Sequence, residues 1–190
     1  GKAYQNWTSS LTTLMTSTIP NQRIRRNLFN AVFLIDPVDT SDLKILTWME
    51  EQIRLSAPFR FSYFVTPRNN TRFAKRVLYG WAHIRLKYGP EKAHQFLLNA
   101  KKIHENEISK DDKSGSKVKE THFRTAYQSF VSSKSPRWQS LDELFSPKTR
   151  ESKHIRKMGN HLEHLGVSGP GLFFNGKFYP GKRGDKNIQQ

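Results

Sequence analysis

The chain is 190 residues long, enough for one domain with its own core or for one domain that carries an inserted subdomain. Hydrophobic residues make up 35% of it and aromatic residues 12%, and disordered chains lack so many aromatic rings. The 32 Lys and Arg against 16 Asp and Glu give a formal charge of +16 that favours anionic partners, whereas the lack of Cys excludes disulfides, thiolate metal sites and thiol redox chemistry.

The first part of the chain predicts two helices and two strands. Apolar residues in 7–19 are spaced as on one face of a short helix, which ends at Pro20. Residues 30–35, which are apolar at every position after Asn30, predict a strand that is buried on both faces. A helix over about 39–55 and a second strand over 59–65 follow. Strand, helix and strand in this order predict a βαβ unit.

The middle of the chain predicts a block of helices. Thr71 is a suitable N-cap for one helix, and Gly89 and Pro90 separate it from a second. Residues 105–120 are charged and almost free of apolar side chains, which favours a mobile linker. Apolar spacing from Phe123 onward predicts a third helix.

The last part predicts a long helix and a β-hairpin. Ser146 is the expected N-cap of the helix, with Pro147 as its first residue and Gly166 just after its end. Residues 172–174 and 177–179 flank Asn175-Gly176, the signature of a type I′ turn between two antiparallel strands.

This order of elements resembles a thioredoxin fold with a helical insertion. Several segments are similar to the third thioredoxin-like domain of the UDP-glucose:glycoprotein glucosyltransferases, namely residues 4–11, 24–30, 33–37, 57–61, 166–167 and 174–176. They cover most of the sheet-forming part, whereas residues 72–153 match mainly as a helical insertion of the right size.

The resemblance implies an α/β, thioredoxin-like fold with a helical insertion between the βαβ unit and the C-terminal β-hairpin. We expect a helical lead-in, a split core, an insertion with a flexible linker, and a loose tail. These are residues 1–22 (lead-in), 23–71 and 147–180 (core), 72–146 (insertion, with the linker at about 105–120) and 181–190 (tail). The chain stops before the C-terminal helix that the resemblance implies over the sheet, so either the segment is truncated or a neighbouring element supplies that cover.

The resemblance also implies a domain without catalytic residues. Redox-active thioredoxins carry Cys-x-x-Cys after the first strand, where this chain has Asp36-Pro37-Val38-Asp39 and so has no thiol to exchange. We interpret Asp36 and Asp39 as a strand end and a helix cap, in preference to a catalytic carboxylate pair. Pro170 matches by position the cis-proline that precedes the third strand in the family.

A hydrophobic surface is the expected binding site. The family detects misfolded glycoproteins, whose exposed apolar side chains require an accessible apolar patch on the sensor. The candidates are Phe73, Val77 and Trp81, which share one side of a predicted helix.

Two other kinds of site are suggested by sequence motifs. Asn6 and Asn69 begin Asn-x-Thr sequons and are candidate glycosylation sites. His154, His161 and His164 lie along one predicted helix, but no fourth ligand has suitable spacing, so we predict no metal site.

The resulting hypothesis is a redox-inactive domain of a folding sensor in the endoplasmic reticulum lumen, acting in client recognition or as a scaffold. Its partners are misfolded glycoproteins and neighbouring domains of the same polypeptide, and no apolar run is long enough to span a membrane. We expect no cofactor, since the resemblance places UDP-glucose and a divalent metal in a separate catalytic domain. The alternative is a basic α/β module that binds nucleic acid or another anionic partner, although the basic residues are spread along the whole chain.

Overall fold

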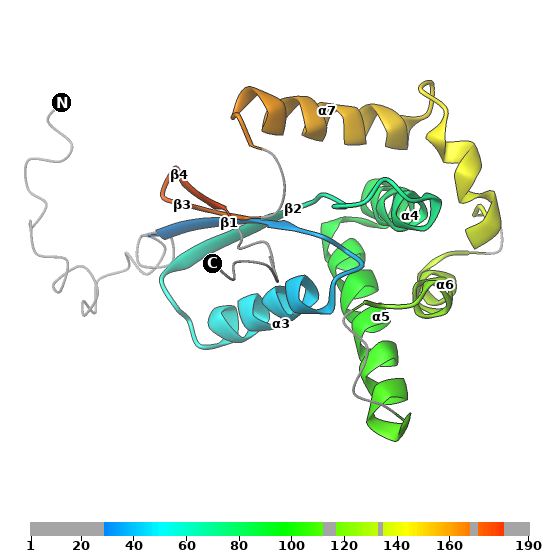
Figure 1. Cartoon of the computed structure of the whole chain (residues 1–190), viewed down its shortest axis with the longest axis horizontal. Helices are drawn as coiled ribbons and strands as arrows, with labels where there is room; N and C mark the ends of the chain where they lie inside the picture. The colour runs from blue at the N-terminus through cyan, green and yellow to red at the C-terminus, as the bar shows by residue number, and fades with distance from the viewer. Residues whose placement is uncertain (1–28, 112–116, 133–134, 168–170, 181–190) are drawn as a thin grey trace, which may run out of the picture.

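The computed structural model describes residues 29–111, 117–132, 135–167 and 171–180, which form one mixed sheet and a block of helices (Figure 1). The four strands lie in the order β2-β1-β3-β4. Central strand β1 (Phe29–Ile35) is parallel to β2 (Phe59–Val65) and antiparallel to β3 (Gly171–Phe174), and β3 is antiparallel to β4 (Lys177–Pro180). The first strand of the chain, β1, therefore pairs at the centre of the sheet with β3, the first strand of the C-terminal hairpin.

Helix α3 (Thr40–Arg54) connects β1 to β2 and confirms the predicted βαβ unit. Its N-cap is Asp39, whose Oδ1 accepts hydrogen bonds from the backbone N–H of Ser41 at 2.8 Å and of Asp42 at 3.3 Å. Leu43 and Leu46 are buried on the side of α3 that faces the core, and this burial holds the helix in place.

The predicted hairpin is confirmed as well. Asn175 and Gly176 have φ of 49° and 86°, the left-handed conformation that a type I′ turn requires at both central positions. The turn is also bonded to β1, because Asn175 Oδ1 accepts from the backbone N–H of Asn30 at 2.8 Å. The backbone N–H of Asn175 donates to the Asn30 carbonyl at 2.9 Å.

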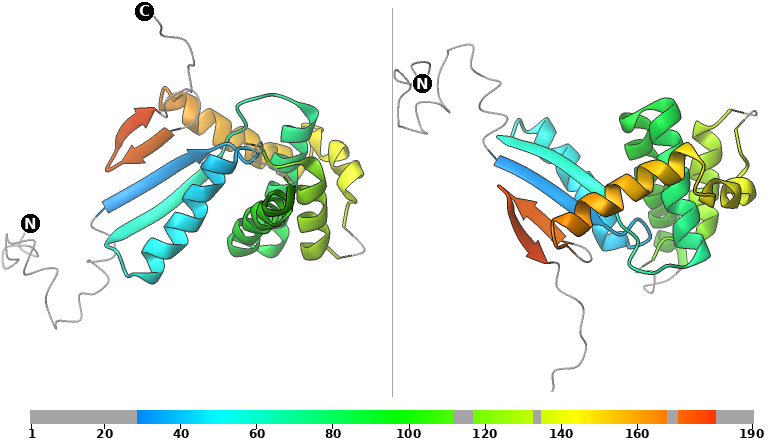
Figure 2. Two further views of the ribbon diagram at one scale, coloured as in Figure 1. Left: turned by 60° about the horizontal axis from the view of Figure 1, so that its bottom comes forward. Right: turned by 90° about the horizontal axis from the view of Figure 1, so that it is seen from above.

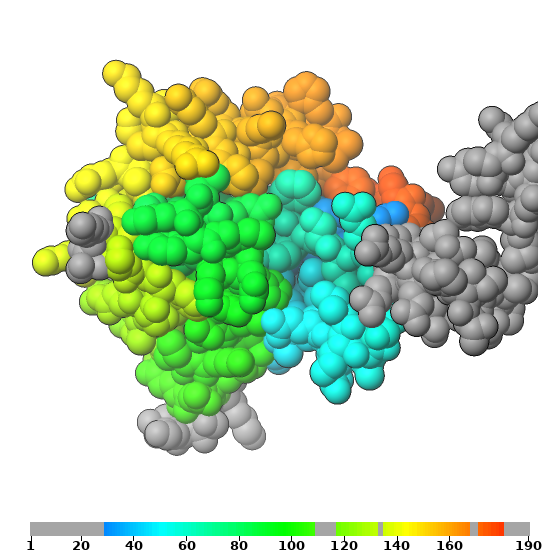
Figure 3. Space-filling view, turned by 180° about the vertical axis from the view of Figure 1, so that it is seen from behind, coloured from blue at the N-terminus to red at the C-terminus, as the bar shows by residue number. Residues whose placement is uncertain are grey.

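The described helices between β2 and β3 are packed around α4, which contacts each of the others (Figure 3). They are α4 (Arg72–Tyr88), α5 (Pro90–Asp111), α6 (Glu120–Phe130), the 3-10 helix η2 (Trp138–Phe145) and α7 (Arg150–His164). Gly80 lies in the middle of α4, where an added Cβ would be 3.3 Å from Leu141 and 3.5 Å from Trp138. The missing side chain thus lets η2 approach α4 closely.

Two predicted boundaries are wrong. The linker expected at about 105–120 starts later, because α5 continues to Asp111 with His104 buried in its last turns. Helix α7 begins at Arg150 with Thr149 as N-cap, and not after Ser146, because the Thr149 hydroxyl accepts from the backbone N–H of Ser152 at 3.2 Å. The lead-in over 1–22 and the tail over 181–190 lie outside the described residues.

Helices α3 and α7 lie on opposite faces of the sheet (Figures 1 and 2). On the side of α3, the Trp48 ring is 6.0 Å from that of Phe33 in β1, measured between centroids. On the other side, the Phe64 ring of β2 is 6.2 Å from the His161 ring of α7. Alternate residues of each strand thus face the two helices.

Candidate functional site

The turn between β1 and α3 is the position at which a redox-active thioredoxin holds its two cysteines, and here three carboxyl groups and one guanidinium gather around it. Asp36 is buried at the end of β1, and its carboxylate accepts from the backbone N–H of Val38 at 3.1 Å and of Arg68 at 3.2 Å. Asp42, in the first turn of α3, accepts from the backbone N–H of Asp36 at 2.7 Å. The carboxylates therefore bind the turn to the loop after β2.

Arg68 connects this network to the start of α3. Its Nη2 lies 3.0 and 3.1 Å from the two carboxylate oxygens of Asp42, and its Nη1 lies 3.4 Å from Asp39 Oδ2. Burial raises the pKa of Asp42, an effect that the hydrogen bond from Asp36 and the charge of Arg68 oppose. Each of the three carboxylates accepts hydrogen bonds from the surrounding protein, so the cluster stabilises the turn and offers no uncommitted base for catalysis.

A second segment covers this turn. The chain that returns from α5 to α6 passes beside it, where Val118 donates its backbone N–H to the Val38 carbonyl at 3.0 Å. Lys117 and Asp39 form an isolated antiparallel bridge, and Val118 is buried. A thioredoxin active site needs accessible sulfur atoms at a helix N-terminus. In this chain Asp39 caps that helix and the insertion covers the turn, so the geometry as well as the composition excludes dithiol chemistry.

The predicted hydrophobic patch is wrong for two of its three residues. Trp81 is 1% exposed and Val77 is fully buried, because α4 is surrounded by the other helices of the insertion. Phe73 is half-buried, with its ring 5.9 Å from that of Phe123 in α6. The apolar spacing that suggested a binding surface is that of a central core helix.

The remaining predicted sites are placed as follows. Pro170 and Asn6 lie outside the described residues. Asn69 is exposed, two residues before Thr71, whose hydroxyl oxygen accepts from the backbone N–H of Ala74 at 3.2 Å and caps α4 as predicted. The sequon at Asn69 therefore lies on the surface immediately before α4.

The histidines of α7 face different surroundings. The ring of His154 is half-buried 6.3 Å from the Trp81 ring, and burial lowers its pKa. His161 lies against Phe64, and His164 Nδ1 is 2.7 Å from the carbonyl of Asn160. In the described part of the chain, no three His, Cys, Asp or Glu side chains are placed to hold a metal ion. None of the helices described is long and apolar enough to cross a membrane.

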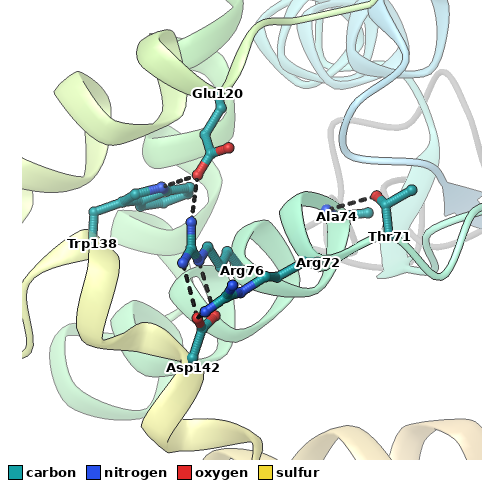
Figure 4. Close-up of polar contacts among 7 residues, drawn as sticks. All are labelled: Thr71, Arg72, Ala74, Arg76, Glu120, Trp138 and Asp142. Atoms are coloured by element: carbon teal, nitrogen blue, oxygen red, sulfur yellow. Dashed lines mark hydrogen bonds and ion pairs between the residues drawn. The ribbon is translucent and has the colours of Figure 1, made fainter.

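A half-buried ionic network joins three helices of the insertion, and no sequence motif indicated it (Figure 4). Arg76 of α4 donates from Nε at 2.9 Å and from Nη2 at 2.8 Å to the two oxygens of Asp142 in η2. Its Nη1 donates at 2.9 Å to Glu120 of α6, which also accepts from the indole N–H of Trp138 at 2.8 Å. Arg72 binds the same Asp142 carboxylate. The network fixes η2 and α6 against α4.

Comparison with known proteins supports the fold. A family model described as a thioredoxin-like domain matches residues 1–190. No curated protein matches the chain. Three solved structures are similar to it: one titled a protein-disulfide isomerase from Pseudomonas syringae, a thioredoxin-like oxidoreductase from Silicibacter pomeroyi, and oxidised BdbD from Bacillus subtilis.

The three proteins resemble this chain in structure more than in amino-acid sequence. The Pseudomonas protein is 10% identical with a TM-score of 0.56, and the match covers 85% of this chain and 90% of that one. The Silicibacter protein is 13% identical with a TM-score of 0.55, over 82% and 79% of the two chains. BdbD is 12% identical with a TM-score of 0.52, over 80% and 78%. The fold predicted from the sequence is thus confirmed, and the chain belongs to the family of thioredoxin-like domains.

Proposed function

We propose that the chain is a redox-inactive thioredoxin-like domain of a UDP-glucose:glycoprotein glucosyltransferase, working in the endoplasmic reticulum lumen as a scaffold and in the recognition of misfolded glycoproteins. The observation that carries the proposal is the rebuilt turn after β1, where carboxylates and Arg68 replace a dithiol and Val118 covers it. The matched family includes the thioredoxin-like domains of this glucosyltransferase. In this proposal, UDP-glucose and a divalent metal belong to a separate catalytic domain.

The end of α3 is a better client-binding surface than the predicted α4 residues. Ile53 is 61% exposed and Leu55 is 60% exposed, and both are large aliphatic side chains. Two such residues near one helix end offer apolar area to an unfolded segment without requiring a deep pocket. The basic surface of the chain would accelerate encounters with acidic clients, an effect on the association rate more than on affinity.

The experiment compares the 190-residue chain bound to one N-glycoprotein in two states, native and reduced with carboxymethylated cysteines, by fluorescence anisotropy. We expect preferential binding to the unfolded state, and we expect Ile53→Ser with Leu55→Ser to weaken it about tenfold. The matched control is Leu165→Ser, which changes a comparably exposed leucine at the end of α7.

Two results would contradict the proposal. One is equal affinity for the native and the unfolded glycoprotein, and the other is a double variant that binds like the Leu165→Ser control. Tight binding of an oligonucleotide that falls steeply with salt would instead support the alternative of an anionic partner.

A further inference from the structure

One face of the sheet carries a connected group of aromatic side chains. On the side of α3, the rings of β1, β2 and β3 form a group that we call the aromatic face, defined by Phe29, Phe33, Trp48, Phe59, Phe61 and Phe174. Neighbouring rings are close: the centroids of Phe29 and Phe59 are 5.3 Å apart, and those of Phe29 and Phe174 are 5.7 Å apart. Trp48, which extends from α3 over this group, is 42% exposed.

Helix α3 covers this face only in part. It lies along β2, and no helix of the described chain lies over β3 and β4 on this side (Figure 2). Leu172 and Phe174 of β3 are half-buried, and Tyr179 of β4, which pairs with Leu172 and shares its face, is 46% exposed. A sheet that leaves half of an apolar face uncovered lacks the second packed layer that stable domains have.

We propose that residues 7–19 of the same chain pack on the aromatic face as an amphipathic helix beside α3. Their apolar side chains are spaced at i, i+4, i+7, i+8 and i+12, which places them on one side of a helix: Trp7, Leu11, Leu14, Met15 and Ile19. Residues 3–22 contain no charged side chain, unlike the rest of this basic chain. Such a helix matches an apolar surface and does not require any charge to be buried.

The position of the segment also favours this occupant. The described chain begins at Phe29, which belongs to the aromatic face, and residues 20–28 form the connection. Nine residues reach about 30 Å when extended, enough to reverse direction and return along the sheet. A helix of thirteen residues is about 20 Å long, close to the roughly 23 Å of a seven-residue strand.

The C-terminal residues match the aromatic face less well than residues 7–19 do. Residues 181–190 include three Lys and Arg and a single aliphatic side chain longer than alanine, Ile188. If these residues packed on the exposed rings, their charged groups would lose contact with water. The free energy of that desolvation exceeds what the apolar contact of one isoleucine contributes. In the proposed arrangement, the helix formed by residues 7–19 supplies the second layer over the aromatic face.

Disulfide trapping tests the proposal cleanly because the chain has no cysteine of its own. Leu11→Cys, Leu14→Cys and Met15→Cys would each be combined with Tyr179→Cys on the aromatic side and oxidised at low protein concentration. The matched control combines each with Arg156→Cys, an exposed residue of α7 on the opposite side of the sheet. Circular dichroism of the reduced proteins verifies that every variant is folded.

We expect at least one pair with Tyr179→Cys to form an intramolecular disulfide several-fold faster than its Arg156→Cys control. Equal rates in both sets, or no intramolecular disulfide in any pair with Tyr179→Cys, would overturn the proposal. A disulfide-linked dimer as the main product would overturn it too, and would identify a second copy of the chain as the occupant. Glycoprotein binding is measured separately, so failure of the proposed function does not affect this result.

Discussion

Val118 donates its backbone N–H to the carbonyl of Val38 at 3.0 Å, so the inserted helices are hydrogen-bonded to the very turn that holds the cysteines of redox-active relatives. The insertion thus covers the position at which a redox-active thioredoxin carries its cysteines.

We therefore expect that two cysteines introduced by Asp36→Cys and Asp39→Cys would not make the chain a disulfide reductase. Val118 would still cover the turn, and the changes remove the N-cap of α3, a loss of about 1 kcal/mol. Insulin reduction with dithiothreitol measures the activity, with Asp36→Ala and Asp39→Ala as a cap-free control for lost stability. Turnover comparable to that of a thioredoxin would contradict the covered turn.

Trp81→Ala should destabilise the chain severely. The side chain is 1% exposed in the main core, and truncating a buried tryptophan typically costs about 3–5 kcal/mol. Ile53→Ala, at an exposed position, should change the free energy of unfolding by no more than about 0.5 kcal/mol. Urea denaturation followed by far-UV circular dichroism measures both, and similar midpoints for the two variants would refute the burial of Trp81.

The Asp142 network should contribute to stability in an acid-dependent way. Hydrogen bonds from Arg76, with smaller contributions from Arg72, lower the pKa of Asp142 from 3.8 to about 2. A carboxyl group with a lowered folded-state pKa stabilises the fold above its unfolded pKa and loses that effect as the pH falls through its folded pKa. We expect Asp142→Asn to be less stable than the parent at pH 5 and the difference to shrink toward pH 2. A pH-independent difference in urea midpoints would exclude this ionic contribution.

Gly171→Ala and Gly159→Ala should have opposite effects. An added Cβ at Gly171 would be 2.6 Å from the Phe178 ring and 2.7 Å from the Tyr179 carbonyl, so the hairpin would have to shift. Nothing lies within 4 Å of the corresponding position at Gly159 in α7, where alanine should stabilise the helix by about 0.5–1 kcal/mol. Thermal melts compare the two, and a stabilised Gly171→Ala variant would show that the hairpin is not as close as described.

The sheet was predictable because its signals are local. Three patterns that span only a few residues each specify it: the apolar residues before Asp36, the helix cap at Asp39 and the Asn175-Gly176 turn. The structure has the strand, the helix start and the turn where these patterns predicted them. The lack of cysteine was equally sufficient to exclude thiol redox chemistry. These features depend on backbone preferences and on residue identity, which a single sequence contains.

The surface could not be predicted in the same way. Trp81 and Ile53 are both apolar residues on amphipathic helices, and only the number of neighbouring helices decides that one is buried and the other exposed. The pairing of Arg76 with Asp142 joins positions 66 apart, and its partners are ordinary surface residue types in the sequence. Tertiary arrangement, which periodicity does not encode, determines both.

The bond between Asn30 and the hairpin turn has a consequence for the order of folding. Its two partners are 145 positions apart, and the inserted helices lie between them. Closing so long a loop is entropically costly while the intervening chain is unfolded, and contacts of high sequence separation slow folding. The insertion, whose contacts are mostly between consecutive helices, would therefore form early and shorten the effective loop, leaving the hairpin to dock on the central strand last.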